Sequence, residues 1–274
     1  MSKVWFITGS SRGFGRQFVQ AALERGDRVA ATARSTHSLA DLAGAHGDAI
    51  LPLSLDVTDK AAVDQVVKRA HEHFGRLDIV VNNAGYGMFG TVEETTEQQV
   101  RDQMETNFFG ALWVTQAALP LLRARGAGHI VQISSVGGVT AFPNLGVYNA
   151  SKWALEALSE ALAQEVAAFG IKVTLVEPGG FATDWGGSSA VFAEPMPVYH
   201  GLREALAAYW RDVEPGDPAA TGAALLKIVD ADNPPLRVFF GTGPLPMVQQ
   251  TYAERLKIWE EWSEVSAQAQ GSTA

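Results

Sequence analysis

Short, almost wholly apolar runs alternate with helical patterns along most of this chain. The runs expected to form strands are Val4–Thr8, Arg28–Ala33, Ile50–Leu55, Leu77–Val81, His129–Ser134, Ile171–Glu177 and Leu236–Phe240. The stretches expected to form helices are Gln17–Arg25, Asp59–Phe74, Glu97–Arg125 and Tyr148–Gly170, with Asp59 placed to cap its helix. Strands this apolar need cover on both faces, and the intervening helices supply it. The sequence therefore predicts an α/β fold with a doubly wound parallel sheet.

The chain is expected to form one domain spanning residues 1–274, because no low-complexity linker divides it. Residues 179–217 fall outside the alternation and are rich in glycine, proline and aromatic residues. Long insertions of this kind are often functional, and we interpret this one as a substrate lid. The alternative is a surface excursion whose aromatic residues cover its own helix. Residues 266–274 are expected to form a frayed tail.

Composition excludes several classes of function. A formal net charge of −9 argues against a nucleic-acid partner, because phosphate binding needs a basic surface. With no cysteine, the chain has no disulfide, no thiolate nucleophile and no cysteine metal site. The first residues lack the features of a signal peptide, and no stretch has the ~20 apolar residues that span a bilayer. We therefore expect a cytoplasmic protein without a membrane partner.

A glycine-rich turn lies between the first expected strand and the first expected helix. Thr8-Gly9-Ser10-Ser11-Arg12-Gly13-Phe14-Gly15 carries glycines at the spacing G-x3-G-x-G. Glycine permits a tight turn and lets the backbone approach a pyrophosphate, which rests on the helix N-terminus. Placed between a strand and a helix, the turn predicts a dinucleotide site on a Rossmann-like fold.

The second strand indicates which dinucleotide is bound. An NAD site needs a carboxylate near the end of this strand, where it accepts a hydrogen bond from the ribose 2′-hydroxyl. No acidic residue lies between Asp27, at the wrong end of the strand, and Asp41, in the following helix. Arg34 lies in that neighbourhood and could clamp a 2′-phosphate with help from Arg12. The pattern favours NADP(H) over NAD(H); the alternative is that both arginines are solvated loop residues.

Tyr148 and Lys152 lie four residues apart at the start of the last long helical stretch. Residues four apart share one face of a helix, so the phenol and the ammonium can be neighbours. A nearby ammonium favours the phenolate and is expected to lower the pKa of Tyr148. The pair is therefore a candidate general acid and base, although an exposed tyrosine beside a solvated lysine has the same spacing.

Three further polar segments are expected near this pair. Ser134 and Ser135 end one strand, and Asn82–Gly85 closes another, at the carboxyl edge where open α/β sheets bind ligands. Asn107 lies inside an apolar helical stretch, where a buried amide needs hydrogen-bond partners. That requirement alone fits a structural network as well as a functional one.

Together these residues resemble the short-chain dehydrogenase/reductases in their single-domain form. The resemblance runs from about Lys3 to Phe240 and includes the glycine turn, Asn82–Gly85, Asn107, Ser135, Tyr148, Lys152 and Pro178-Gly179. Ser135 precedes Tyr148 by thirteen residues, which is the spacing usual in the family. No departure is found in the catalytic set. The residues after Phe240 are not covered by the family's motifs.

The resemblance implies a catalytic tetrad for transfer of hydride between a nicotinamide and a carbonyl or secondary alcohol. In that family pattern Tyr148 exchanges the proton, Ser135 donates to the substrate oxygen, Lys152 holds the ribose, and Asn107 holds a water. It also implies cofactor contacts from Gly9, Ser11, Arg12, Gly13, Phe14, Gly15, Arg34, Asp56, Val57, Asn83, Ala84, Gly85, Tyr148, Lys152, Pro178, Gly179 and Thr183. Association through the helices bearing Asn107 and Tyr148, as a homodimer or homotetramer, is a further implication.

The expected activity is that of a carbonyl reductase or alcohol dehydrogenase. The lid aromatics, with Phe89, Phe142 and Trp185, suggest an apolar pocket for a hydrophobic ketone. One alternative is a non-catalytic NADP-binding sensor, which would be expected to lack the tyrosine or the lysine. Another is an epimerase or dehydratase on the related extended fold, disfavoured by the glycine spacing and chain length. No metal site is expected, because the histidines form no H-E-x-x-H motif.

Overall fold

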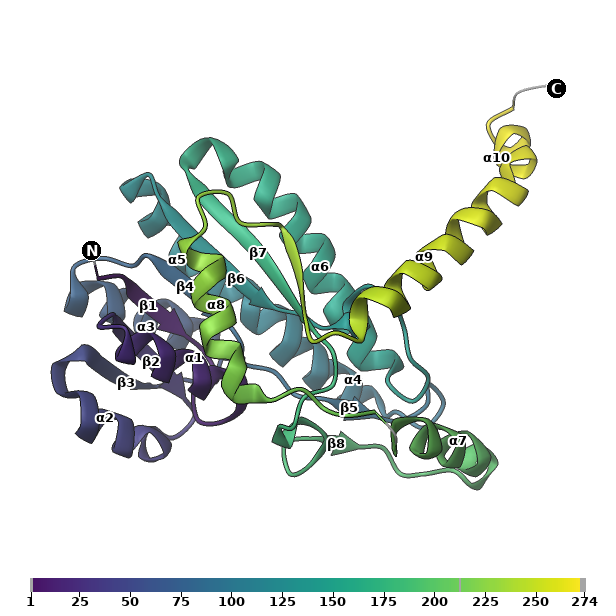
Figure 1. Cartoon of the computed structure of the whole chain (residues 1–274), viewed down its shortest axis with the longest axis horizontal. Coiled ribbons are helices and arrows are strands. Elements are labelled where there is room, and N and C mark those ends of the chain that lie inside the picture. Colours follow the sequence, from purple (N-terminus) through teal and green to yellow (C-terminus); the bar gives the residue numbers. More distant parts are fainter. Residues whose placement is uncertain (1, 212, 272–274) are drawn as a thin grey trace.

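The computed structural model describes residues 2–211 and 213–271 and contains a parallel sheet with the strand order β3-β2-β1-β4-β6-β7-β9 (Figure 1). Its strands are β1 (Val4–Ile7), β2 (Arg28–Ala33), β3 (Ile50–Ser54), β4 (Ile79–Asn82), β6 (Gly128–Ile133), β7 (Ile171–Pro178) and β9 (Arg237–Phe240). All neighbouring pairs in this sheet are parallel. The strand order reverses between β1 and β4, so the prediction of a doubly wound parallel sheet is confirmed.

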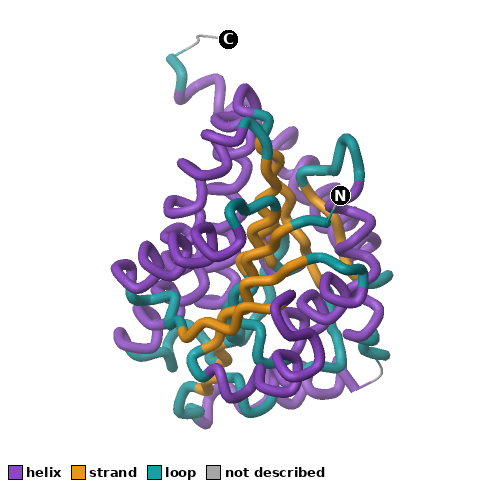
Figure 2. The backbone as a smooth tube through the Cα atoms, turned by 90° about the vertical axis from the view of Figure 1, so that its left-hand side faces the viewer, coloured by secondary structure: helices purple, strands orange, loops and turns teal. Residues whose placement is uncertain are grey.

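Helices cover both faces of the sheet, as Figure 2 shows with the strands between two helical layers. One layer contains α1 (Gly13–Glu24), α2 (Ala40–His46) and α8 (Thr221–Asp230), and the other contains α3 (Lys60–Phe74), α5 (Gly110–Arg125) and α6 (Gly146–Val166). Side chains alternate between the two layers: Trp5 and Ile7 of β1 belong to the first core, and Val4 and Phe6 to the second. The apolar residues of the strands thus fill two hydrophobic cores.

The long helical stretch from Glu97 is interrupted once. Helix α4 (Glu97–Met104) begins with a capping box formed by Thr96 and Gln99, and a π-helical turn over Glu105–Phe109 separates it from α5. The sequence predicted one helical stretch over Glu97–Arg125 and did not indicate the π turn. Such turns are frequent at functional sites, and this one contains Asn107. The predicted cap of α3 is confirmed, since the Asp59 carboxylate accepts from the backbone N–H of Ala62 at 3.0 Å.

The insertion at residues 179–217 folds back over the carboxyl edge of the sheet. Its strand β8 (Val191–Phe192) pairs with β5 (Met88–Phe89), and its helix α7 (His200–Arg211) follows. The buried carboxylate of Glu94 anchors it, accepting from the backbone N–H of Met196 at 2.7 Å and from Arg203 at 2.6 Å. The segment is therefore tied to the body by side chains distant in sequence.

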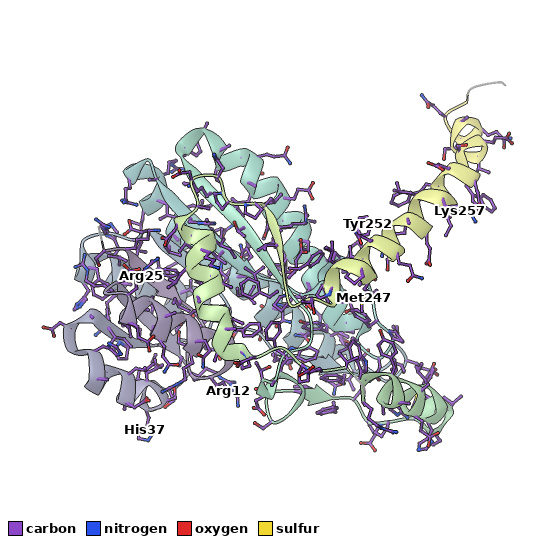
Figure 3. All side chains as sticks on the ribbon, viewed as in Figure 1. Arg12, Arg25, His37, Met247, Tyr252 and Lys257 are labelled. Atoms are coloured by element: carbon purple, nitrogen blue, oxygen red, sulfur yellow. The ribbon has the colours of Figure 1, made fainter. Side chains whose placement is uncertain are left out.

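The chain ends in a helical arm that projects from the body (Figure 1). Helices α9 (Pro244–Glu261) and α10 (Ser263–Ala269) form it, and Figure 3 shows side chains pointing outward from it. Trp259 and Trp262 are exposed there. The prediction of a frayed tail from Ser266 is wrong up to Ala269, and residues 272–274 lie outside the described residues. Among the helices described, none has the length and hydropathy needed to cross a membrane.

Candidate active site

The glycine turn joins β1 to α1 in a conformation that depends on glycine. Gly9 and Gly13 have φ of 66° and 55°, in the left-handed region that favours glycine. A Cβ at Gly9 would lie 2.8 Å from the Cα of Ala84, and one at Gly15 would lie 2.3 Å from the carbonyl oxygen of Gly9. The turn therefore packs directly against the segment after β4.

A cavity of about 740 Å³ opens at this edge of the sheet. All the predicted site residues line it except Gly15 and Asn107, which lie behind its wall. The cavity is also lined by residues that the sequence did not indicate, among them Tyr86, Leu145, Val136 and Asp184. Tyr86 and Asp184 directly follow Gly85 and Thr183, which were predicted to line the site. This proximity in the chain is the sequence signal that could have identified them. The turn, the cavity and the two arginines at its rim fit a nicotinamide dinucleotide.

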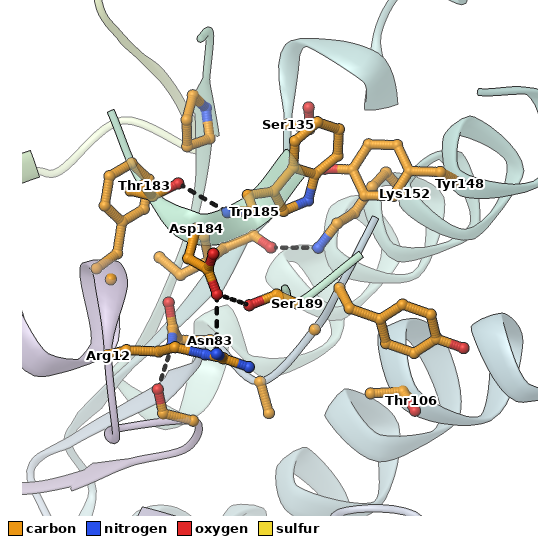
Figure 4. Close-up of a pocket in the computed structure, with 18 of the residues that line it drawn as sticks. Arg12, Asn83, Thr106, Ser135, Tyr148, Lys152, Thr183, Asp184, Trp185 and Ser189 are labelled. Atoms are coloured by element: carbon orange, nitrogen blue, oxygen red, sulfur yellow. Dashed lines mark hydrogen bonds and ion pairs between the residues drawn. The ribbon is translucent and has the colours of Figure 1, made fainter. Parts of the chain in front are cut away.

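Tyr148 and Lys152 are both buried at the start of α6. The Nζ of Lys152 donates to the carbonyl oxygen of Ile133 at 2.8 Å and lies 5.9 Å from the centroid of the Tyr148 ring. The expected neighbouring of phenol and ammonium is therefore present in the structure, and both side chains face the cavity (Figure 4).

The pKa of Tyr148 is not lowered, which corrects the sequence expectation. Burial raises it to about 12, and a hydrogen bond with Ser135 only partly offsets this effect. Burial also lowers the pKa of Lys152 to about 8, although Glu156 opposes that change. For both groups burial is the largest cause of the shift, because it disfavours the charged form of each. Tyr148 is thus held as a protonated phenol.

The two serines after β6 point to different partners. Ser135 accepts from the backbone N–H of Gly137 at 3.0 Å and also bonds to Tyr148. Ser134 lies toward α6: a Cβ at Gly138 would be 2.7 Å from its Oγ and 3.2 Å from Oε1 of Glu156. The geometry places Ser135, rather than Ser134, beside the phenol.

Asn107 is buried in the π turn, and its amide is fully used. Its Oδ1 accepts from the backbone N–H of Tyr86 at 3.1 Å, and its Nδ2 donates to the Tyr86 carbonyl at 3.1 Å and to Ser151 at 3.2 Å. A Cβ at Gly85 would lie 3.0 Å from this Oδ1 and 3.7 Å from Nζ of Lys152. Asn107 and Lys152 therefore flank the same glycine, while the water link between them stays a prediction.

Aromatic side chains form the wall beside Tyr148. The Trp185 ring lies edge-on to Tyr148 with centroids 5.0 Å apart, and Phe89 packs against Trp185 at 5.1 Å. A Cβ at Gly87 would come within 2.7 Å of the Trp185 ring, so glycine is what leaves room for the indole. Phe142 packs on Trp210 at 6.1 Å elsewhere on the same wall. The part of the cavity next to the phenol is thus apolar.

The two arginines at the cavity rim have different surroundings. Arg34 is exposed directly after β2. Arg12 binds Asp184 of the insertion at 2.9 Å, and Asp184 also accepts from Ser188 and Ser189 (Figure 4). This ion pair, which was not predicted, joins the glycine turn to the insertion. Within the described residues, no three histidine, aspartate or glutamate side chains are grouped to hold a metal ion.

Comparison with known proteins places this geometry in a family. The profile of the short chain dehydrogenase family matches residues 3–190. A solved short-chain dehydrogenase from Streptomyces avermitilis is 42% identical, with a TM-score of 0.92 over 98% of both chains.

Two further relatives have more specific names. A 3-ketodihydrosphingosine reductase from Bacteroides thetaiotaomicron is 38% identical over 94% of this chain and 93% of its own. A solved alcohol dehydrogenase from Thermococcus sibiricus, complexed with 5-hydroxy-NADP, is 26% identical, with a TM-score of 0.74 over 88% of this chain and 96% of its own. The chain therefore belongs to the short-chain dehydrogenase family and is an NAD(P)-dependent oxidoreductase.

Proposed function

We propose that this protein is an NADP(H)-dependent carbonyl reductase, acting in reverse as an alcohol dehydrogenase, whose substrate is a hydrophobic ketone. The observation that carries the proposal is the arrangement of the buried Tyr148 and Lys152, with Ser135 beside them, against the aromatic wall. It supplies a proton donor, a hydrogen-bond donor for the carbonyl oxygen and an apolar surface in one cavity.

The bound nicotinamide would supply the hydride, and the residues of this chain manage the proton. Because burial raises the pKa of Tyr148 to about 12, its phenol stays protonated at neutral pH and can give its proton to the substrate oxygen. Ser135 donates a hydrogen bond to the same oxygen as its charge develops. The Lys152 ammonium favours the phenolate left on Tyr148.

The choice of NADP(H) rests on Arg34 and Arg12. Both guanidinium groups are exposed at the cavity rim, and the chain offers no carboxylate at the end of β2. Arg34 is free to meet a 2′-phosphate, whereas Arg12 would have to exchange or share its bond with Asp184. The complex of the T. sibiricus relative with 5-hydroxy-NADP supports this assignment.

The substrate class follows from the wall beside Tyr148. Trp185, Phe89 and Phe142 face the place where the carbonyl must lie, so a ketone with a bulky apolar group would bury most surface there. The reductase activity named for the B. thetaiotaomicron relative supports a substrate of this kind. The residues at 179–217 would then act as the substrate lid of a single domain.

A panel of ketones with NADPH tests the proposal. We expect kcat/KM to rise from small aliphatic ketones to bulky aryl or long-chain ketones. Cofactor binding without turnover of any ketone would contradict it and favour the non-catalytic sensor.

We also propose that the protein forms a homodimer or homotetramer through α5 and α6. A monomer observed by light scattering would contradict this proposal.

A further inference from the structure

Four polar side chains follow one face of α6 at intervals of four residues: Tyr148, Lys152, Glu156 and Glu160. The first three are buried, and the side chain of Glu160 is 55% exposed. This row runs from the phenol of Tyr148, past the lysine, into the C-terminal half of the helix. Glu156 has no place in the mechanism described above.

Glu156 meets a second buried carboxyl group. Glu177 of β7 is 1% exposed and Glu156 is 4% exposed. Both approach Nε of Arg237 on β9, at 3.0 Å from Oε2 of Glu156 and 3.5 Å from Oε1 of Glu177. Arg237 also binds Glu160, with Nη2 at 2.7 Å from Oε2. The guanidinium of Arg237 therefore contacts three carboxyl groups, and two of them, those of Glu156 and Glu177, are buried away from solvent.

Glu156 and Glu177 together have more buried carboxyl oxygens than hydrogen-bond donors to satisfy them. Oε1 of Glu156 and Oε1 of Glu177 are both buried without a hydrogen-bond partner among the described residues. Two carboxylates this close and this dry do not both stay ionised, since burial and repulsion each favour a proton on one of them. Burial and the negative charge of Glu156 raise the pKa of Glu177. A single proton shared by the two groups would supply the donor that their buried oxygens lack.

Glu156 is also linked to the catalytic lysine. Its charge raises the pKa of Lys152 against the effect of burial. Ser134, whose hydroxyl lies beside Oε1 of Glu156 at Gly138, directly follows Ile133, and the Ile133 carbonyl accepts from Lys152 at 2.8 Å. The carboxyl pair and the lysine therefore share one stretch of packed polar groups behind the cavity.

A groove borders the pair on the side of Glu177. A groove of about 450 Å³ beneath the base of α9 is lined by Glu177, Arg237 and Glu160, with Val248 and Tyr252 of α9 among its other walls. The charged group of α9 on this side, Arg255, donates to the carbonyl of Val139 and stacks on Trp153 and Tyr252. Among the described residues, Arg237 is thus the cation that binds the pair, and Glu177 lies between the pair and the groove.

We propose that Glu156 and Glu177 are positioning residues of the reaction: they share one proton, keep the ammonium of Lys152 charged, and exchange that proton with solvent through the groove beneath α9. The inference rests on the proposed function for its effect on turnover. The shared proton itself does not depend on any substrate.

Infrared spectroscopy tests the shared proton without cofactor. The wild-type protein is expected to show the C=O stretch of a protonated carboxyl group at pH 7, and Glu177→Gln is expected to lack it. Glu160→Gln is the matched control, because Glu160 also binds Arg237 but is exposed; its spectrum should keep the band. Absence of the band from the wild type overturns the shared proton.

The pH profile of ketone reduction tests the link to Lys152. Removing a nearby opposite charge lowers the pKa of an ammonium by ~1 unit or more, so Glu156→Gln should move the alkaline limb of kcat to lower pH by about that amount. Glu160→Gln should leave it in place. A uniform loss of activity with an unmoved limb would assign Glu156 a merely structural role and overturn the link.

If no ketone substrate is found, the link between Glu156 and Lys152 can still be tested. In that case the NMR titration of the side-chain carbon next to Nζ of Lys152, identified by its absence in Lys152→Arg, replaces the pH profile. The expected result is a lower titration midpoint in Glu156→Gln than in the wild type or Glu160→Gln. Equal midpoints would overturn the proposal, whatever the substrate of the enzyme.

Discussion

Replacing Arg34 by aspartate is expected to reverse the preference between the two nicotinamide dinucleotides. Arg34 is the first residue after β2, is exposed, and lines the same cavity as the glycine turn. In the parallel sheet this is the position from which a dinucleotide site reads the ribose 2′ group. The substitution removes a cation from that position and puts a hydrogen-bond acceptor there.

The size of the effect follows from the exposure of the side chain. A charge-assisted bond contributes ~1.5–3 kcal/mol, and an exposed guanidinium lies at the lower end of that range because water screens it. The new carboxylate would repel a phosphate ~6 Å away in water by about 1 kcal/mol. Together these effects shift the ratio of dissociation constants by roughly 100-fold toward NADH.

The assay is a separate titration of NADPH and NADH, followed by nicotinamide fluorescence. Arg69→Asp provides the control, since Arg69 is exposed on α3 away from the cavity and its replacement changes the net charge equally. The control is expected to keep the wild-type ratio. An unchanged ratio in Arg34→Asp would refute the assignment of Arg34 to the 2′-phosphate.

Three other predictions concern the walls of the site. Gly15→Ala should weaken NADPH binding more than ~10-fold by titration, because its Cβ would lie 2.3 Å from a backbone oxygen, whereas Gly44→Ala, with open space around its Cβ, should not. Trp185→Ala should raise KM for bulky ketones by up to ~10-fold through loss of its aromatic contacts, while an equal rise for small ketones would contradict the lining role. Hydrogen bonds to Thr91, Met196 and Arg203 lower the pKa of Glu94 from 4.5 to about 2, so its ionised form should hold the insertion above pH 4.5 and lose this hold as pH falls toward 2. Limited proteolysis should accordingly cut residues 190–211 faster in Glu94→Gln at neutral pH, and equal rates would contradict the anchoring role.

The sheet and the proximity of Tyr148 to Lys152 were predictable because their signals are local. Apolar runs set the strands, and the spacing of Tyr148 and Lys152 places both on one face of α6. The glycine turn was recognisable because the positive φ angles of Gly9 and Gly13 favour glycine over other residues. In each of these cases the residue types and their spacing are enough to indicate the local structure.

The remaining features depend on contacts between distant segments. The pair of Arg12 with Asp184 joins residues 172 positions apart, and no local pattern announces it. Glu156 is an acidic residue on a helix in the sequence, and only the packing of β7 and β9 shows that it is buried with Glu177. The raised pKa of Tyr148 likewise depends on how completely the site excludes water.

The most direct test of the central claim is ketone reduction by Tyr148→Phe at saturating NADPH, followed as loss of nicotinamide absorbance. The substitution removes the phenolic oxygen and keeps the ring that packs on Trp185. We predict unchanged affinity for NADPH and a fall in kcat of at least ~10²-fold, the contribution expected of a general acid. Near-normal turnover with unchanged binding would show that another group delivers the proton and would contradict the account.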